Sequence, residues 1–211
     1  MLRIVAISDT HGQHQGLHIP DGDVLIHAGD LTSHGSLSEV MAFNEFLGTL
    51  PHPHKIIIAG NHDFCFEQEP TQSQALLTNG TYLQDKAITI DGIKFYGSPW
   101  QPWFYNWAFN LARGTEIRAK WDLIPWDTDI LITHGPPYGH GDRTTRREFV
   151  GCTDLLETVE KIRPQAHIFG HIHEGYGITS NEHTAFLNAS TCTVNYEPIN
   201  AALVFQFQEK N

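Results

Sequence analysis

Five short groups of polar residues contain Asp, Asn or His, whose side chains bind divalent transition metals. The groups are Asp9-Thr10-His11, Gly29-Asp30, Gly60-Asn61-His62-Asp63, His134-Gly135 and Gly170-His171-Ile172-His173. They offer carboxylates, a carboxamide and imidazoles but no thiolate, a donor set that suits Mn, Fe, Co, Ni or Zn rather than a Cys-rich structural zinc. Two divalent ions that share one bridging group need about seven protein ligands. The groups supply seven: Asp9, His11, Asp30, Asn61, His134, His171 and His173.

A pair of such cations would support the hydrolysis of phosphate esters. A hydroxide that bridges two cations has a lowered pKa, and the cations offset the charge that develops on the phosphoryl oxygens. The chain contains no G-x-S-x-G elbow and no P-loop, so no Ser or Cys nucleophile is required. The expected reaction is therefore attack of a metal-bridging hydroxide on a phosphoester.

The charge balance narrows the class of substrate. With 13 Lys and Arg against 24 Asp and Glu, the chain has a net charge of −11. A face able to clamp duplex nucleic acid needs clustered basic side chains, so duplex nucleic acid is not an expected partner. Two divalent cations would let this acidic chain bind a small phosphodiester or nucleotide without a basic groove.

Each polar group follows a short apolar run rich in β-branched residues. These runs, at 2–7, 23–28, 55–59, 129–133 and 166–169, are typical of strands buried on both faces. Ligands of α/β sheets bind at the carboxyl ends of the strands, so five groups distant in sequence can converge there. The glycines beside the ligands, at 29, 60, 135 and 170, are expected to permit close backbone approach.

The remaining patterns predict helices and further strands. Helical windows at 36–48, 71–78, 113–124 and 152–162 alternate with the apolar runs, and the first opens with the capping box Ser36-Leu37-Ser38-Glu39. Residues 81–97 are expected to form a hairpin around Asp91-Gly92. The tail contains three strand candidates, at 176–179, 184–188 and 201–207. The sequence thus predicts one α/β domain over residues 1–211, built from two packed sheets with helices outside.

The cysteines and the N-terminal residues indicate the cellular compartment of the protein. Cys65, Cys152 and Cys192 are widely spaced and form no C-x-x-C pair, which argues against a disulfide framework. The apolar run at 2–7 is too short for the core of a signal peptide, and no stretch approaches 18 apolar residues. We therefore expect a cytoplasmic protein that has no membrane partner.

The ordered polar groups resemble the calcineurin-like metallophosphoesterase superfamily, from residue 4 to about residue 207. More narrowly, four segments resemble the metallophosphoesterase-domain-containing family, which is associated with the hydrolysis of phosphodiesters and cyclic nucleotides. They are Gly97-Ser98-Pro99-Trp100, Trp103-Phe104, residues 173–177 and residues 188–193. The resemblance implies a four-layer α/β/β/α sandwich of two packed mixed sheets flanked by helices.

The resemblance also implies roles for the metal ligands. One metal would be held by Asp9, His11, Asp30 and His173. The other would be held by Asp30, Asn61, His134 and His171, so that Asp30 bridges the two. Some animal members of the family carry Gly at the position of His171, which weakens their second site. Because this chain has His171, we predict a full dinuclear site, with manganese as the first choice of metal and Fe, Co, Ni or Zn as alternatives.

Two further residues of the Gly-Asn-His-Asp motif are predicted to act in catalysis. The resemblance places His62 opposite the scissile phosphate, as an acid or electrostatic partner, with Asp63 fixing its ring. A protonated imidazole in that position would neutralise the leaving alkoxide. The alternative is a purely structural hydrogen bond between His62 and Asp63.

Four residues outside these motifs are candidates for substrate binding: His34, Trp100, His140 and Arg143. The two histidines closely follow ligand-bearing loops. The aromatic stretch 100–107 is either a lip that stacks a nucleobase or a small core or homodimer interface. Arg143 belongs, with Arg146 and Arg147, either to a mobile lid that contacts phosphate or to a solvated surface.

We therefore expect a metal-dependent phosphodiesterase that acts on small diesters, with cyclic nucleotides as the favoured class. The first alternative is a phosphomonoesterase acting on nucleotides or phosphoproteins. The second is a binding module that has kept the fold without catalysis, because a fold alone does not determine function.

Overall fold

The first of two packed sheets combines strands from residues 2–82 with the last described strand of the chain. The computed structural model describes residues 1–207. The five-stranded sheet has the order β13-β1-β2-β3-β4, in which only β13 runs antiparallel to its neighbour. Its strands are β1 (Leu2–Ile7), β2 (Val24–Ala28), β3 (His54–Ile58), β4 (Thr81–Tyr82) and β13 (Leu203–Phe207). The parallel alignment of β1, β2 and β3 brings their carboxyl ends to one edge.

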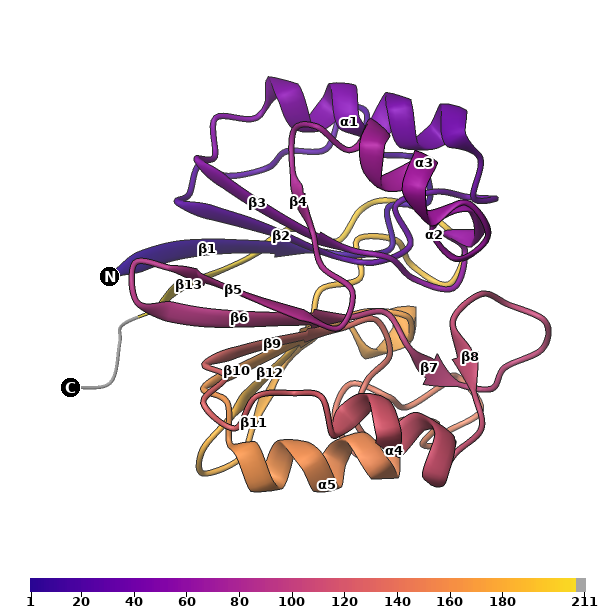
Figure 1. Ribbon diagram of the computed structural model, residues 1–211, viewed down its shortest axis with the longest axis vertical. Coiled ribbons are helices and arrows are strands. Elements are labelled where there is room, and N and C mark those ends of the chain that lie inside the picture. Colours follow the sequence, from indigo (N-terminus) through magenta and orange to yellow (C-terminus); the bar gives the residue numbers. More distant parts are fainter. Residues whose placement is uncertain (208–211) are drawn as a thin grey trace.

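The second sheet has six strands in the order β11-β12-β10-β9-β6-β5, with β6, β9, β10 and β12 parallel. Its strands are β5 (Lys86–Ile90), β6 (Ile93–Ser98), β9 (Ile130–Thr133), β10 (Ala166–Phe169), β11 (Gly177–Ser180) and β12 (Ala185–Asn188). Figure 1 shows the two sheets face to face, with helices over both outer faces. The predicted four-layer α/β/β/α sandwich is confirmed.

Within residues 1–207, five α-helices flank the sheets. Those of the first half are α1 (Leu37–Thr49), α2 (Phe64–Gln68) and α3 (Pro70–Leu76), and those of the second are α4 (Thr115–Trp121) and α5 (Thr153–Ile162). The predicted capping box of α1 is present: the Ser36 hydroxyl accepts a hydrogen bond from the Glu39 N–H, and the Glu39 carboxylate accepts one from the Ser36 N–H. The apolar face of α1 packs on the first sheet through Val40, Phe43 and Leu47. Helix α2 was not predicted, because its five residues are too few to show a helical period.

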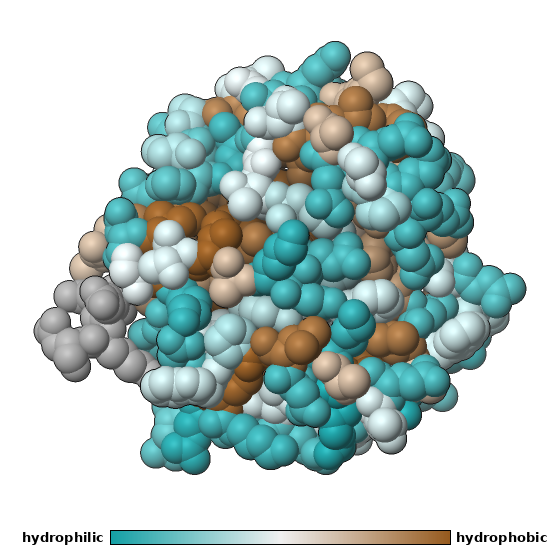
Figure 2. Space-filling view, viewed as in Figure 1, coloured by the Kyte–Doolittle hydropathy of each residue, from teal (hydrophilic) through white to brown (hydrophobic). Residues whose placement is uncertain are grey.

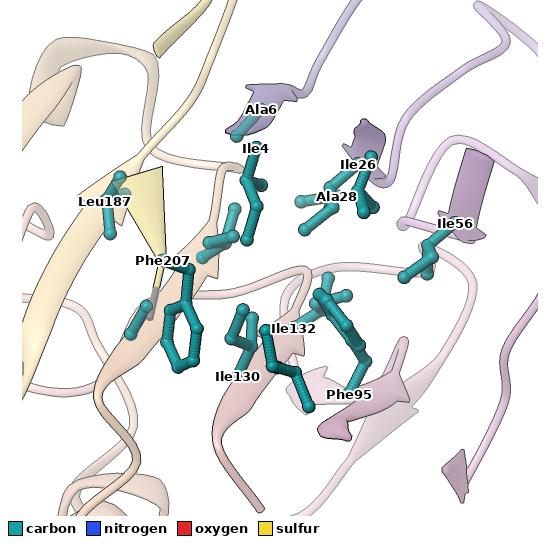
Figure 3. Close-up of a cluster of buried hydrophobic side chains, with 14 of the residues drawn as sticks. Ile4, Ala6, Ile26, Ala28, Ile56, Phe95, Ile130, Ile132, Leu187 and Phe207 are labelled. Carbon is teal, nitrogen blue, oxygen red and sulfur yellow. The ribbon is translucent and has the colours of Figure 1, made fainter. Parts of the chain in front are cut away.

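The inner faces of the two sheets form the main core. Ile4, Ile26 and Ala28 of the first sheet face Phe95 and Ile132 of the second (Figure 3), and all five are fully buried. Burial of each large apolar side chain contributes about 1.5–3 kcal/mol. This shared core fixes the position of one sheet relative to the other, and therefore the relative positions of the loops at their common edge.

Two local predictions have different outcomes. Asp91 and Gly92 both have positive φ, 49° and 82°, as a two-residue hairpin turn between β5 and β6 requires. The start of the predicted hairpin is wrong, because β4 at Thr81–Tyr82 pairs with β3 in the other sheet. A ribbon of β7 (Gln101–Pro102) and β8 (Asn110–Leu111) was not foreseen; two-residue strands have no period to read.

The face of the protein shown in Figure 2 is mainly hydrophilic. Hydrophobic residues form separate patches on that face. Over residues 1–207, no helix combines the length and apolar character required to cross a bilayer.

Two buried histidines make the stability of the fold sensitive to acid. His27 of β2 shares a hydrogen bond of 3.0 Å with Thr10, and His167 of β10 shares one of 2.8 Å with Thr133. Burial lowers the pKa of each to about 3. The unfolded chain binds a proton at each His below about pH 6.5 and the folded chain does not, so stability is lost as pH falls from about 6.5 toward 3.

We therefore expect His167→Gln to flatten the pH dependence of unfolding. The variant should lose up to about 1.4 kcal/mol per pH unit of slope between pH 6 and 4. Urea unfolding at a series of pH values, with chelator in every sample, measures this slope. The exposed His183 provides the matched control, His183→Gln, whose slope should equal that of the parent. An unchanged slope in His167→Gln would contradict the conclusion that burial lowers the pKa of His167.

Candidate metal centre

The predicted metal ligands lie at the common edge where both sheets end. Asp9 and Asp30 follow β1 and β2, and Asn61 follows β3. His134 and His171 follow β9 and β10 of the second sheet. An isolated parallel bridge between Ser8 and Ser190 ties the two sheets together beside these residues. The carboxyl ends of the strands therefore converge as the strand pattern predicted.

The first group of donors consists of Asp9, His11 and His173, whose ligand atoms all lie within 4.8 Å of one another. The Nε2 atoms of the two histidines are 3.2 Å apart, and His173 Nε2 lies 3.4 Å from Asp9 Oδ1. Of the three residues, only His173 is distant in the chain, 162 positions after His11. It lies in the 3₁₀ turn at His173–Gly175.

The second group consists of Asp30, His134 and His171, again within 4.8 Å of one another. His134 Nε2 lies 2.9 Å from Asn61 Oδ1 and 3.4 Å from Asp30 Oδ2. The same Asp30 oxygen is 3.9 Å from His11 Nε2 in the first group. Asp30 is thus the carboxylate that lies between the two groups, and all seven predicted ligands are brought together.

The orientation of the rings fits divalent cations. The Nδ1–H of His134 donates to the Ala28 carbonyl, and that of His173 donates to the Thr193 carbonyl. In the neutral ring this leaves the Nε2 lone pair of each directed at the centre, beside oxygens that can only accept. Backbone carbonyls that fix the tautomer in this way are the usual outer partners of metal-binding histidines. The donor set and its tautomers therefore fit a metal centre.

Backbone conformation at the centre is unusual. Asp9, His11, Asp30 and His171 all have positive φ, between 44° and 67°. A non-glycine residue in this region costs on the order of 1 kcal/mol or more and is found mainly at functional sites. Hydrogen bonds hold these conformations: the Asp9 N–H donates to Gly29 and the His11 N–H to Asp30. The backbone is thus strained at these four residues, and this conformation directs their side chains toward the centre.

Charge and burial set the protonation states of the donors. Burial would raise the pKa of Asp9, but the hydrogen bond with His173 and the charges of His173, His134 and His11 together outweigh burial and hold that pKa well below its usual value. The pKa of Asp30 is lowered likewise, against burial, mainly by His134. Burial lowers the pKa of His171 to about 3. At His134 burial also acts to lower the pKa, but Asp30, Asp9 and the Ala28 carbonyl together outweigh it and raise the pKa to about 9. Both carboxylates are therefore ionised at neutral pH, and a cation would displace a proton from His134.

Three of the four glycines beside the ligands are required by close contacts. A Cβ on Gly29 or Gly60 would lie 2.5 or 2.3 Å from a ligand side chain, and one on Gly170 would lie 2.0 Å from Asp9 Oδ2. The expectation for Gly135 is wrong: a Cβ there would meet only Gln101 Cβ, at 3.7 Å, which is an ordinary contact.

Gly170→Ala and Gly135→Ala therefore form a matched pair, since each glycine adjoins a predicted ligand. We expect Gly170→Ala to lower the free energy of unfolding by about 1–3 kcal/mol, because the methyl group overlaps Asp9 and Ser8. It should also lower the metal content. Gly135→Ala should change the unfolding free energy by less than about 1 kcal/mol. Denaturant unfolding and metal analysis test the pair, and equal effects of the two variants would contradict the packing argument.

His62 faces the centre, but Asp63 does not orient its ring as expected. The Nδ1–H of His62 donates to the Ser33 carbonyl at 2.8 Å, and the ring stacks on Trp107 with centroids 4.2 Å apart. The Asp63 carboxylate instead accepts hydrogen bonds from the backbone N–H groups of Thr32 and Gly60. Asp63 therefore fixes the loops around Asp30 and Asn61. The sequence does not reveal the hydrogen bond between His62 and Ser33, because Ser33 is 29 residues away from His62.

The position of His62 is compatible with two roles. One of its ring nitrogens belongs to a group of donors with His11 and Asp30, all within 4.8 Å. The Nε2 atom can therefore meet either a substrate oxygen or a cation. The predicted role, acid or electrostatic partner of the phosphate, stays a prediction.

The centre forms the floor of a pocket of about 210 Å³. Beyond the predicted ligands and His62, its lining comprises Phe104, Trp107, Glu174, Val194 and Tyr196. The aromatic stretch 100–107 pointed to the first two. No local signal pointed to Tyr196, a residue in an irregular segment whose ring centroid lies 4.8 Å from that of His11.

The four predicted substrate-binding residues do not line this pocket. Trp100 is half-buried between two core clusters, and its indole N–H donates to Asp85, so it has the alternative, core role. His140 stacks on Phe186 of β12 with ring centroids 3.7 Å apart. His34 is exposed outside the pocket. Arg143 lines another hollow, of about 530 Å³, together with Arg147 and Phe149; the lining of this hollow shares Glu174 with the metal pocket.

Comparison with known proteins agrees with the geometry. The family model described as calcineurin-like phosphoesterase matches residues 2–175. The human protein named Metallophosphoesterase domain-containing protein 1 is 50% identical, over 96% of this chain and 70% of its own length. A Caenorhabditis elegans protein, UPF0046 protein K07C11.7, is 42% identical, over 99% of this chain and 76% of its own.

One crystal structure shares the fold, with a TM-score of 0.68 at 14% identity, over 99% of this chain and 100% of that chain. Members of the matched family typically bind divalent metals, for which this chain has candidate His and Asp groups. The sequence motifs, the two-sheet fold and the relatives agree: this chain belongs to the calcineurin-like phosphoesterase family.

Proposed function

We propose that this protein is a dinuclear metal-dependent phosphodiesterase that hydrolyses small phosphodiesters, with cyclic nucleotides as the favoured class. The observation that carries the proposal is that Asp30 Oδ2 lies 3.9 Å from His11 Nε2 of the first donor group and 3.4 Å from His134 Nε2 of the second, beside an open pocket. We propose Mn²⁺ as the first choice of metal, with Fe, Co, Ni or Zn as alternatives.

Hydrogen bonds within the chain orient the two carboxylates of the proposed centre, Asp30 and Asp9. Asp30 directs Oδ2 between the groups, because its Oδ1 accepts a hydrogen bond of 2.7 Å from the His62 N–H. Asp9 is held by the His171 N–H and by the Ser190 hydroxyl. When bound, two divalent cations would lower the pKa of a water molecule and offset the charge on phosphoryl oxygens. The protein thus supplies a rigid, preorganised set of ligands.

We propose that His62 donates a proton to the leaving group. With Nδ1–H fixed on the Ser33 carbonyl, Nε2 is directed into the pocket, and a proton on Nε2 can pass to a leaving alkoxide. Stacking on Trp107 holds the ring plane in this direction. Both contacts position the imidazole without using the atom that would react.

The size of the pocket supports a small substrate. A volume of about 210 Å³ holds little more than a phosphoryl group and its immediate substituents. The acidic net charge of −11 further disfavours a duplex nucleic acid. We accordingly propose a small diester or nucleotide as the substrate.

The test compares bis-p-nitrophenyl phosphate with p-nitrophenyl phosphate, using protein loaded with Mn, Fe, Co, Ni or Zn. We expect a higher kcat/KM for the diester, and turnover of 2′,3′- or 3′,5′-cyclic nucleotides in the same panel. A preference of tenfold or more for the monoester would instead indicate a phosphomonoesterase. Full metal occupancy with no hydrolysis of any ester would indicate a binding module.

A further inference from the structure

We propose that Tyr196 is a positioning residue for the first group of metal donors: its ring holds His11 and His173 in place and so helps to retain the cation that they bind. Tyr196 lines the metal pocket, is 47% exposed, and comes from the irregular segment between β12 and β13. The proposal rests on the proposed function, because it requires the two cations. It deepens that function by naming a residue that keeps one of them bound.

The ring of His11 lacks the hydrogen bond that orients His134 and His173. Each of those two donates from Nδ1–H to a backbone carbonyl. The Nδ1 atom of His11 is buried and has no hydrogen-bond partner among residues 1–207, although its Nε2 lies 3.2 Å from His173 Nε2. Metal-binding histidines are normally oriented by a partner of their other ring nitrogen. The orientation of His11 must therefore come from packing.

Aromatic contacts supply this packing. The ring of Tyr196 meets that of His11 edge-to-face, with centroids 4.8 Å apart and planes at 69°. It meets the ring of His173 in the same way, at 5.5 Å and 79°. Such edge-to-face pairs are favourable arrangements of two rings. Rotation of either histidine away from the centre would break its contact with Tyr196, so the contact favours the orientation that binds a cation.

The contacts of Tyr196 are confined to one side of the centre. Within residues 1–207, its ring makes no ring contact with His134 or His171, the two histidines of the second group. His171 instead contacts Phe104, with centroids 6.1 Å apart. Removal of the Tyr196 ring should therefore weaken the first cation and spare the second.

Hydrogen bonds hold Tyr196 against the two histidines. Its φ of 59° lies in a region that is strained for a residue other than glycine. Its N–H donates at 2.8 Å to the Thr193 carbonyl, which also accepts the Nδ1–H of His173. Its own carbonyl accepts a hydrogen bond of 2.8 Å from the side chain of Gln13, two residues after His11. The turn that carries Tyr196 is thus tied to the segments of both histidines.

The test measures the affinity of each position for Mn²⁺. Competition with a chromophoric chelator gives the two dissociation constants, and anomalous diffraction from crystals grown at limiting Mn²⁺ shows which position loses its ion. We expect Tyr196→Ala to raise one dissociation constant about 10–100-fold, the usual effect of losing an outer partner of a metal-binding histidine. The affected ion should be the one beside His173, and the other should bind as in the parent. Tyr196→Phe should restore both affinities, because the contacts are made by the ring.

Tyr105→Ala is the matched control. Tyr105 is 75% exposed and also has a positive φ, 48°, but it does not line the metal pocket, so both affinities should equal those of the parent. Gln13→Ala is a second variant, which keeps the ring of Tyr196 and removes the hydrogen bond to its carbonyl. It should weaken the same ion by a smaller factor, and it decides the question if Tyr196→Ala does not fold.

The proposal and the proposed function fail in different ways. Unchanged affinities in Tyr196→Ala, or in Gln13→Ala where it decides the question, would overturn the role of Tyr196. Equal weakening of both ions, loss of the ion beside His134 alone, or a Tyr196→Phe that behaves as Tyr196→Ala would overturn it as well. Selective loss of the first ion in a protein that hydrolyses no phosphoester would support the role of Tyr196 and refute the proposed phosphodiesterase.

Discussion

Asp30→Asn is expected to lower kcat/KM for a phosphodiester by about 10³-fold or more and to reduce metal binding at both groups. Asp30 Oδ2 lies 3.4 Å from His134 Nε2 and 3.9 Å from His11 Nε2, so it lies between the two donor groups and is the proposed bridging ligand. The substitution keeps the shape of the side chain but removes the negative charge on which a bridging ligand depends. Loss of a single preorganised electrostatic group costs about 10²–10³-fold in other enzymes, and here two cations depend on one group.

Metal analysis and diester turnover measure this result, and a second buried carboxylate provides the control. Asp154 of α5 is 6% exposed and paired with Arg118, away from the centre. Asp154→Asn should lose some stability but retain its metals and its kcat/KM. If Asp30→Asn kept two cations per chain and activity within tenfold of the parent, Asp30 would not be the shared ligand.

His62→Ala is expected to lower kcat by about 10²–10⁴-fold while leaving the metal content unchanged. This range is typical for the loss of a general acid. The ring lies at the pocket with Nδ1–H bound to the Ser33 carbonyl, and the substitution removes the group that we propose protonates the leaving alkoxide. The effect should be smallest for a p-nitrophenolate leaving group, which needs no proton, and largest for an alkoxide.

The comparison of leaving groups separates catalysis from structure, since a merely structural role would lower turnover of both substrates equally. The exposed His183 gives the matched control, and His183→Ala should retain full turnover. Loss of one cation in His62→Ala would contradict the predicted role and would assign His62 to the donor group with His11 and Asp30.

The sequence predicted the parts of the fold that depend on local patterns. β1, β2, β3, β9 and β10 were found because strands buried on both faces read as continuous β-branched runs. The start of α1 and the turn at Asp91-Gly92 were found because capping and positive φ each require particular residues. The convergence of the polar groups followed from the parallel strand order, since parallel strands end at the same edge.

The parts that were not predicted depend on tertiary contacts. Asp63 stands next to His62 in the chain, yet the ring bonds to Ser33 and the carboxylate to Thr32 and Gly60. Trp100 carries the same aromatic ring as Trp103, but its hydrogen bond to Asp85 places it in the core. Tyr196 reaches the pocket from an irregular segment, and such segments have no period that reveals their position.

The central claim is that two neighbouring cations are held by ligands from both sheets and share the Asp30 carboxylate. Anomalous diffraction at the manganese edge, from crystals of Mn²⁺-loaded protein, tests it most directly. We predict two anomalous peaks roughly 3.5–4 Å apart, one on each side of Asp30, with His173 on the first ion and His134 on the second. A single peak, or two ions that Asp30 does not contact, would contradict the account.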